Sequence, residues 1–389
     1  MKNLKTKAFL LVCLLFGLYT NAQIEKAPAR TEGEGPWSQL IIRGVTVIDG
    51  TLSPPIGPID IVVENNRIAS VQVVGFPGMD INPDRRPKLK PGGKELNAEG
   101  MYLLPGFVDT HAHIGGSTQG TPAEYVFKLW LAHGITTVRE VGSGMGLDWT
   151  VDHRNRSEAG EITAPRIIVH AMFPGSSVTS AIEASAWVRE VHRRGAEGVK
   201  LRGATPAATR AIYQTTAELG MGTSNHHDQT SVYSINVLDS ARMGLDSMEH
   251  WYGLPESLFT DRTIQDYPAD YNYSDEQWRF GQAGRLWQQA AAPGSDKWNT
   301  VRDELVDLDF TLSPTFTIYE ANRDVMRARD AEWHSTYTLP TLQEFFMPDP
   351  KLHGYYHFDW TTADEVAWRK NSRHWRNFVT DYKLSLLSI

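Results

Sequence analysis

Two histidines, His111 and His113, lie one residue apart in the stretch LLPGFVDTHAHIGG, residues 103–116. The stretch reads as a short apolar β-strand that ends in polar residues. Side chains i and i+2 of a strand point to the same face, so both imidazoles project into one space. Two neutral imidazoles that converge on a point suit a divalent metal ion. A hydrogen-bonded pair of core or surface histidines has the same spacing, so further ligands must come from elsewhere in the chain.

Three more candidate ligands lie where an apolar strand candidate gives way to polar residues. They are Lys200 in AEGVKLRG, His226 in TSNHHD and His250 in DSMEHW. If these strands are parallel neighbours, their carboxyl ends meet at one mouth of a barrel and bring the side chains together. Histidines from several separate strands are hard to explain by packing. The remaining histidines are expected to be structural, namely His133, His153, His170, His192 and those nearer the C-terminus.

Lys200 needs its own chemistry, because an ammonium group cannot ligate a metal. Nearby cations depress the pKa of a lysine and favour the neutral amine. A neutral amine adds carbon dioxide and becomes a carbamate, whose two oxygens and negative charge suffice to bridge two metal ions. A lysine that forms an ion pair at the strand end is the alternative. The sequence alone leaves both interpretations open.

The pattern around these residues favours a parallel sheet with helical crossovers. From residue 104 onward, strand candidates alternate with helical stretches at residues 121–133, 180–194 and 207–219. Seven strands are predicted, in FVDTHAH, GITTVREVG, APRIIVHAMF, AEGVKLRG, MGTSNHHD, LDSMEHW and DFTLSPTFT. A (β/α) barrel is the predicted fold, and enzymes with this fold place catalysis at the carboxyl ends of the strands. A doubly wound open sheet is the alternative, but no Gly-rich dinucleotide loop supports it.

Residues 23–103 precede the barrel and read differently. After a polar leader, β-branched alternation punctuated by Gly, Pro and Asn predicts a small N-terminal β-sandwich portion, with a Pro-rich surface loop at residues 76–93. Aromatic residues gather in a long insertion at residues 254–310 and again at residues 342–360. Packing over the barrel rim is expected for most of them, and lining of a substrate cleft is the alternative.

The first 22 residues are predicted to be a signal peptide. A basic start is followed by the apolar run AFLLVCLLFGLY and a small-residue cleavage site after Ala22. We therefore expect an exported protein, periplasmic or secreted, with no membrane association after cleavage. Cys13 is the only cysteine of the 389 residues, so the mature chain offers neither a disulfide nor a thiolate ligand. The formal net charge of −8 gives no general electrostatic reason to bind nucleic acid.

The set PGFVDTHAH, GVKL, NHHD and MEHW resembles the metal-dependent amidohydrolase superfamily, nearest to its imidazolonepropionase-like and prolidase-like branch. The resemblance implies a barrel at residues 104–389 and a site for two metal ions, usually zinc. It implies that His111 and His113 hold one metal, that His226 and His250 hold the other, and that N-carboxylated Lys200 bridges them. Asp109 would orient the histidines as a hydrogen-bonded neighbour. The implied reaction is hydrolysis of a C–N bond in a small amide, cyclic amide or dipeptide by a metal-activated hydroxide.

The chain departs from the family at its C-terminal end. The resemblance implies an Asp on an eighth strand, which serves as a metal ligand and as the catalytic base. After NSRHWRNFVTDYK the sequence reads LSLLSI, with no such strand, and Asp381 lies in a helical segment that places it poorly. We therefore expect a C-terminally truncated barrel with strand 8 missing, an open sheet edge and impaired activity. A catalytically inactive metal- or ligand-binding fragment is the alternative function.

Overall fold

The computed structural model describes residues 24–116, 120–142, 144–323, 325–347 and 360–386. The predicted signal peptide, residues 1–22, lies outside this part of the chain. The chain divides into two compact units: Ala29–Phe107 with Gly134–Thr136 forms one, and the remaining residues form the other. No helix within the described ranges is both long enough and apolar enough to cross a bilayer.

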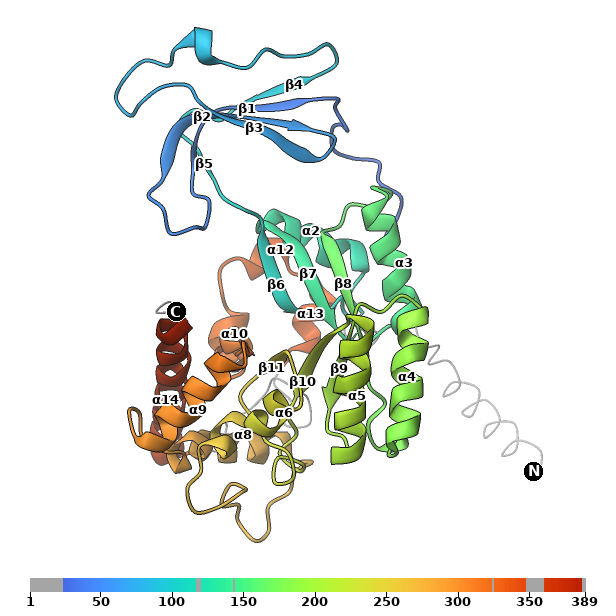
Figure 1. The fold of residues 1–389 in the computed structure, drawn as a ribbon, viewed down its shortest axis with the longest axis vertical. Helices are drawn as coiled ribbons and strands as arrows, with labels where there is room; N and C mark the ends of the chain where they lie inside the picture. Colours follow the sequence, from blue (N-terminus) through green and yellow to red (C-terminus); the bar gives the residue numbers. More distant parts are fainter. Residues whose placement is uncertain (1–23, 117–119, 143, 324, 348–359, 387–389) are drawn as a thin grey trace, which may run out of the picture. The chain divides into compact units, whose positions relative to one another are not determined.

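The smaller unit is built on one mixed five-stranded sheet (Figure 1). Its order is β3-β2-β1-β4, and β5 also pairs with β1. The strands are β1 (Leu40–Val47), β2 (Ile56–Glu64), β3 (Arg67–Val73), β4 (Lys94–Asn97) and β5 (Tyr102–Leu103). Asn65 and Asn66 join β2 to β3 with φ of 51° and 59°, the backbone that a tight two-residue hairpin turn requires. The predicted sandwich portion is therefore a single sheet in the described residues.

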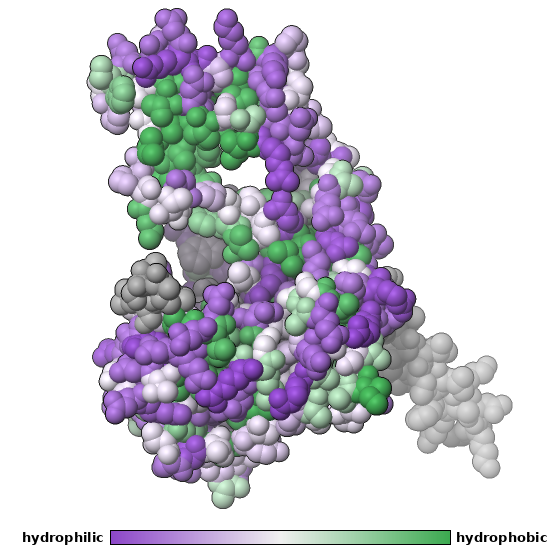
Figure 2. All heavy atoms as spheres, in the orientation of Figure 1, coloured by the Kyte–Doolittle hydropathy of each residue, from purple (hydrophilic) through white to green (hydrophobic). Residues whose placement is uncertain are grey.

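The two faces of this sheet differ in chemistry. Asp60 on β2 is fully buried and binds the guanidinium groups of Arg43 and Arg86 at 2.8 and 2.9 Å. An ion pair compensates a buried carboxylate in this way. On β3, by contrast, Ile68 and Val71 are 67% and 57% exposed. Figure 2 shows apolar side chains gathered over this sheet.

The larger unit contains a seven-stranded sheet with the order β12-β11-β10-β9-β8-β7-β6. The register is parallel for the successive pairs from β7 to β12. The strands are β6 (Phe107–Ala112), β7 (Ile135–Val141), β8 (Arg166–Met172), β9 (Gly198–Arg202), β10 (Gly222–His226), β11 (Ser247–Glu249) and β12 (Thr311–Ser313). All seven predicted strands are present, so the prediction of an incomplete (β/α) barrel is confirmed.

The seven strands nearly close on themselves. In the sheet as described, β6 and β12 stand at the two ends of the strand order. The hydroxyl oxygens of Thr110 on β6 and Ser313 on β12 are nevertheless 3.4 Å apart. The two outer strands therefore meet through side chains, and the gap between them is narrower than the open edge that the sequence predicts.

Helices connect successive strands, as the alternating pattern predicts (Figure 1). They are α2 (Ala123–Ala132), α3 (Leu147–Glu158), α4 (Ala181–Arg193), α5 (Pro206–Leu219) and α6 (Val237–Arg242). Three of them, α2, α4 and α5, match the predicted helical stretches. Ser180 caps α4 through a reciprocal pair of hydrogen bonds with Glu183. Helix α3 was missed because its sequence, LDWTVDHRNRSE, is polar on most positions.

Further helices cover the region beyond β11. They are α7 (Leu254–Ser257), α8 (Glu276–Leu286), α9 (Asp296–Asp307), α10 (Phe316–Arg323), α11 (Val325–Arg329), α12 (His334–Tyr337), α13 (Pro340–Phe345) and α14 (Thr362–Leu386). Trp251 stacks on Tyr319 with ring centroids 4.1 Å apart and meets Trp375 of α14 at 4.8 Å. Trp287 and Trp298 are fully buried. For these aromatic residues the packing interpretation is confirmed.

Gly198 on β9 provides a test of how tightly the side chains inside the barrel are packed. A Cβ at Gly198 would lie 2.3 Å from Nε2 of the buried His170, whereas one at Gly222 on β10 would lie 3.5 Å from the same atom. We expect Gly198→Ala to lower the free energy of unfolding by about 1–3 kcal/mol, because an added methyl group overpacks a filled interior. Gly222→Ala is the matched control and should change it by less than about 0.5 kcal/mol. Urea denaturation of both variants measures the difference, and equal effects would contradict the steric argument.

Candidate metal centre

The structure brings the four predicted histidines together at the carboxyl ends of the strands. The ring centroids of His111 and His113 are 5.3 Å apart. His250 lies 4.7 Å from His111 and 4.4 Å from His226 by the same measure. Lys200 on β9 is 3% exposed, and its charge acts on His111, His226 and His250. All five predicted ligands therefore lie in one region at the carboxyl ends of the strands.

His250 is held in an unusual backbone conformation directly after β11. Its φ is 68°, and its amide donates to the Ser313 carbonyl at 3.0 Å. Its Nδ1 lies 2.8 Å from the hydroxyl of Thr315, which also has a positive φ of 51°. Left-handed backbone in residues other than glycine is uncommon and concentrates at functional sites. This local strain turns the His250 ring toward His111 and His226.

Two buried glutamates, which the sequence analysis missed, accompany the HxH pair. Nδ1 of His111 is 2.5 Å from Oε2 of Glu249, and Nδ1 of His113 is 3.3 Å from Oε1 of Glu140. Both carboxylates are fully buried. A carboxylate that accepts the Nδ1 proton fixes the imidazole tautomer and leaves the Nε2 lone pair for a metal. The signal was present, because Glu249 directly precedes His250 in MEHW and Glu140 ends the strand GITTVREVG.

Arg139 on β7 completes this arrangement from inside the barrel. Its guanidinium donates to Oε1 of Glu249 at 2.5 Å and to the Thr110 carbonyl at 2.7 Å. Burial by itself would raise the pKa of Glu249, but the hydrogen bond with His111 and the charges of Lys200 and Arg139 lower it to about 2. Glu249 is therefore ionised at neutral pH, which makes it a strong acceptor for the His111 proton.

Lys200 has the properties that carbamate formation requires. Burial lowers its pKa from 10.5 to about 7, so much of the side chain is a neutral amine at neutral pH. Its Nζ is buried and makes no hydrogen bond with any described residue. A buried amine without a partner is unfavourable, and a carbamate would present two acceptor oxygens at this position.

The histidines also have the protonation state of a ligand. Burial lowers the pKa of His226 and His250 well below 6.5, so both are neutral imidazoles at neutral pH. Within the described ranges, hydrogen bonds engage Nδ1 of His111, His113 and His250 and leave their Nε2 atoms open. The donor set therefore fits a divalent metal ion. In the same part of the chain, however, no three His, Cys, Asp or Glu side chains converge closely enough to enclose one.

Asp109 lies two residues before His111 on β6. Its Oδ1 accepts the backbone amide of His111 at 3.0 Å. In the structure this carboxylate therefore positions the main chain at His111, while Glu249 contacts the imidazole itself. The predicted role of Asp109 in orienting the histidines is reduced to this indirect contact and stays a prediction.

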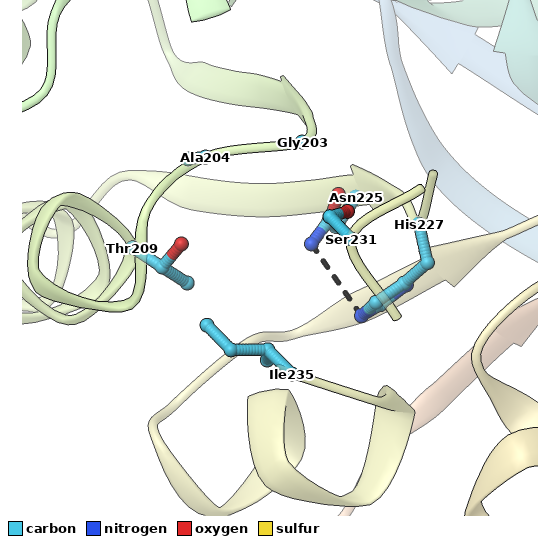
Figure 3. Close-up of a pocket in the computed structure, with 7 residues that line it drawn as sticks. All are labelled: Gly203, Ala204, Thr209, Asn225, His227, Ser231 and Ile235. Atoms are coloured by element: carbon cyan, nitrogen blue, oxygen red, sulfur yellow. Dashed lines mark hydrogen bonds between the residues drawn. The ribbon is translucent and has the colours of Figure 1, made fainter. Parts of the chain in front are cut away.

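The neighbouring histidines His226 and His227 point to opposite sides of β10, as strand alternation requires. Nε2 of His227 is 2.9 Å from the Ser240 hydroxyl of α6 and 3.4 Å from Nδ2 of Asn225. His227 thus lines a small polar pocket outside the histidine cluster (Figure 3). The pocket is formed by Gly203, Ala204, Thr209, Asn225, His227, Ser231 and Ile235. Of the two histidines, His226 is the one that faces His250.

Four tyrosines, Tyr252, Tyr267, Tyr271 and Tyr273, form what we call the tyrosine cluster. The Tyr252 ring lies 6.3 Å from the His226 ring. Tyr267 stacks on Tyr271 with centroids 4.3 Å apart, and electrostatic interactions join Tyr267 to the other three. This group extends the histidine site toward the segment that follows β11.

Glu256 on α7 is a buried acid next to the tyrosine cluster. Its protonation state can be tested through the pH dependence of the free energy of unfolding. Its Oε2 accepts the Gly253 amide at 2.7 Å, and burial raises its pKa from 4.5 to about 7. The folded state therefore binds the proton more tightly than the unfolded chain. The resulting stabilisation is complete below pH 4.5 and is lost as the pH rises through 7.

Glu256→Gln keeps the shape of the neutral acid and should remove this pH dependence. We expect the variant to match the parent at pH 4.5 and to exceed its free energy of unfolding by up to about 3 kcal/mol at pH 8, from the shift of the pKa. Urea denaturation midpoints at both pH values provide the measurement. A variant that is less stable than the parent at pH 8 would show that the ionised carboxylate is the favoured form.

No protein-family model matches this chain. Curated relatives do, over part of its length. An adenine deaminase of Paracoccus denitrificans is 29% identical over 128 residues, which are 29% of this chain and 20% of that protein. Adenine deaminase 2 of Rhizobium etli is 30% identical over 192 residues, or 47% of this chain and 29% of the relative. The matched segments thus span less than a third of these relatives.

Solved structures also align with the chain. A Xaa-Pro dipeptidase with methionine bound in its active site aligns with a TM-score of 0.49 and 16% identity, covering 86% of this chain and 84% of that one. Phenylurea hydrolase B aligns with a TM-score of 0.48 and 16% identity, covering 87% of each chain. In sequence the chain is thus similar to adenine deaminases over part of its length, and its parallel barrel carries the HxH-Lys-His-His set at the carboxyl ends of the strands.

Proposed function

We propose that this protein is a metal-dependent hydrolase of C–N bonds in small molecules. The observation that carries the proposal is the gathering of four imidazoles near the buried Lys200 at the carboxyl ends of the barrel strands. Single buried histidines are common in protein cores. Four histidines that gather next to a lysine with a lowered pKa are instead typical of a functional site.

In this proposal His111 and His113 would hold one zinc ion, His226 and His250 would hold a second, and N-carboxylated Lys200 would be the ligand common to both. When bound, such ions lower the pKa of a water molecule toward neutrality and polarise the carbonyl of the substrate. This reading is supported by the neutral state of the histidines and by the unpaired Lys200 amine.

The protein's own residues prepare the site for that chemistry. Glu249 and Glu140 hold the Nδ1 protons of His111 and His113, so the opposite nitrogens stay unprotonated. Arg139 keeps Glu249 in place from the interior side. Because these groups are buried and fixed by several hydrogen bonds, the site needs little rearrangement when a metal ion arrives.

We propose that the substrate is a small amide, cyclic amide or dipeptide. A second candidate is the deamination of an aminopurine, which the partial sequence match to adenine deaminases favours. Both reactions cleave a C–N bond by addition of water, but only the second releases ammonia from a heterocycle. A metal-binding protein without turnover is the third possibility.

One experiment separates these candidates. The protein is reconstituted with zinc, and its metal content is measured beside hydrolysis of a dipeptide and N-acyl amino acid panel and ammonia release from adenine. We expect two zinc ions per chain and turnover on the amide panel, with both lost in His226→Ala. His227→Ala is the matched control and should keep its zinc, because His227 faces the other side of β10. Ammonia release alone would favour the deaminase, and zinc without turnover would favour the binding protein.

We further propose that the protein is exported to the periplasm or secreted, on the predicted signal peptide and the cysteine-free mature sequence. N-terminal sequencing of natively produced protein should find a chain that begins directly after Ala22. An intact Met1 in a cytoplasmic fraction would refute export.

A further inference from the structure

The first described residues of the chain lie against helix α3 of the larger unit. We call residues 24–28, which have no regular secondary structure, the N-terminal strap. Ile24 and Ala27 of the strap are buried, with 7% and 3% of their surface exposed. Ala29 begins the smaller unit, so the strap is the segment that leads from the barrel into that unit. A short segment of this kind stays in place only through its contacts.

The polar contacts of the strap converge on three residues of α3. The Ala27 amide donates to Nε2 of His153 at 3.1 Å, and the Ala27 carbonyl accepts from the Arg156 guanidinium at 2.6 Å. Nζ of Lys26 lies 3.0 Å from Oδ2 of Asp152, but both side chains are more than a third exposed, so this ion pair contributes little. The two bonds to the Ala27 backbone therefore hold the strap, and the bond to His153 is the buried one.

His153 accepts this bond only as a neutral imidazole. Its Nδ1 lies 2.8 Å from the carbonyl oxygen of Trp149, which can only accept, so the Nδ1 proton points there. Nε2 is then the unprotonated nitrogen, and its lone pair receives the Ala27 amide. A second proton would turn Nε2 into a donor that faces another donor, and the bond would be lost.

The side chain of His153 has apolar surroundings. It has no exposed surface. Its ring packs on the Trp149 ring with centroids 3.8 Å apart, and the Phe127 ring of α2 lies at 5.8 Å. An imidazolium ion in this position would lose its hydration without gaining a buried counterion, which is unfavourable.

The charged groups near His153 act in both directions. Burial lowers its pKa from 6.5, and the positive charges of Arg156 and Lys26 act in the same sense. The hydrogen bond to the Trp149 carbonyl and the charge of Asp152 raise it, but the result is a lowered pKa. Because the docked strap disfavours the proton, the proton must equally disfavour the docked strap.

We propose that His153 is an acid-sensitive switch, which holds the N-terminal strap on α3 while its imidazole is neutral and releases the strap when the imidazole gains a proton. The released form binds the proton more tightly, so the contribution of the switch is complete above pH 6.5 and is lost as the pH falls below that value. Release frees the segment that leads into the smaller unit. The inference is independent of the proposed hydrolase activity, because it involves no predicted metal ligand.

Hydrogen exchange of the Ala27 amide tests the switch directly. The protein is the natively produced full chain, and the protection factor is the exchange rate of an unstructured peptide divided by that of the protein at the same pH. We expect this factor to fall at least about fivefold between pH 7.5 and pH 5. About thirtyfold is the upper limit for a released imidazole with the ordinary pKa of about 6.5. Mass spectrometry with fragmentation of the peptic peptide that covers residues 24–28 isolates this amide.

Two glutamine variants separate the switch from general effects of pH. His153→Gln keeps an uncharged acceptor next to Ala27 at every pH, so its protection factor should be equal at pH 7.5 and pH 5. His133→Gln is the matched control, because Nδ1 of the exposed His133 likewise faces the carbonyl four residues earlier, that of Leu129, at 2.7 Å. This control should keep the fall of the parent.

The outcomes decide the proposal even if one variant fails to fold. Equal protection of the parent at both pH values would overturn it, as would a fall of the parent's size in His153→Gln. The C2 proton of His153, followed by NMR in the parent, gives an answer without any variant. It should titrate below pH 6.5, and a midpoint at or above 6.5 would exclude the switch.

Discussion

If the proposed two-zinc site forms, Lys200→Ala is expected to reduce bound zinc from two ions to at most one per chain after dialysis. The variant removes the only group that is placed to supply a bridging carbamate from β9. Loss of groups that merely support ligands costs 10–100-fold in metal affinity, so loss of a bridging ligand should cost at least as much. For the stability of the metal-free protein we expect no loss, because the variant no longer buries a lysine whose pKa is lowered from 10.5 to about 7. Metal-free Lys200→Ala should therefore be no less stable than the parent below pH 7.

A second variant gives this prediction its control. Lys200→Met fills the space that Lys200→Ala leaves open, but neither of them forms a carbamate. Added acetate or propionate should restore part of the zinc content in Lys200→Ala and none in Lys200→Met, because only the smaller side chain leaves room for a carboxylate. Elemental analysis after dialysis, with and without the acid, makes the comparison. Full zinc loading of both variants without any added acid would exclude the bridging role.

Glu249→Gln is expected to have the largest effect on folding. The carboxylate is fully buried and compensates the Arg139 guanidinium inside the barrel, at 2.5 Å. Removal of one partner of a buried pair leaves the other charge uncompensated and costs about 3–5 kcal/mol. The same change should weaken zinc binding about 10–100-fold, because the amide no longer holds the His111 tautomer so firmly.

The two consequences of Glu249→Gln are separable. Urea denaturation of the metal-free protein measures the first, and a zinc titration against a chromophoric chelator measures the second. Glu218→Gln removes an exposed partner of Arg189 and should change stability by less than about 1 kcal/mol. A double variant, Arg139→Met with Glu249→Met, should recover much of the stability but none of the zinc affinity. If Glu249→Gln unfolds at the same urea concentration as the parent, the buried pair does not contribute as proposed.

The strands and the gathering of the histidines could be predicted from the sequence, for a physical reason. An apolar strand followed at once by His111, His226 or His250 is a local pattern, and parallel strands bring their carboxyl ends together without further information. Lys200 likewise lies at the end of an apolar strand, in GVKL, so its place was predicted in the same way. These residues could therefore be placed without knowledge of any long-range contact.

The supporting carboxylates could not be placed in that way. Glu140 and Glu249 lie on strands whose neighbours in the barrel are set by tertiary structure, so their contacts with His113 and His111 depend on the closed arrangement of β6, β7 and β11. A polar residue that ends a strand is usually solvated, and only burial reveals a different role. The same limit applies to the tyrosine cluster, because Tyr252 and Tyr267 lie in loops whose path has no periodic signal.

The contacts of Trp251 have a consequence for the order of folding. Trp251 directly follows His250, yet its ring partners Tyr319 and Trp375 come from α10 and α14, much later in the chain. During synthesis, the segment that carries His250 therefore emerges well before the side chains that enclose its neighbour. Contacts this distant in sequence make folding slow. The histidines on β6 and β10 do not depend on these contacts, but His250 should become fixed only when α14 has docked, so the proposed metal site is expected to be complete only after that docking.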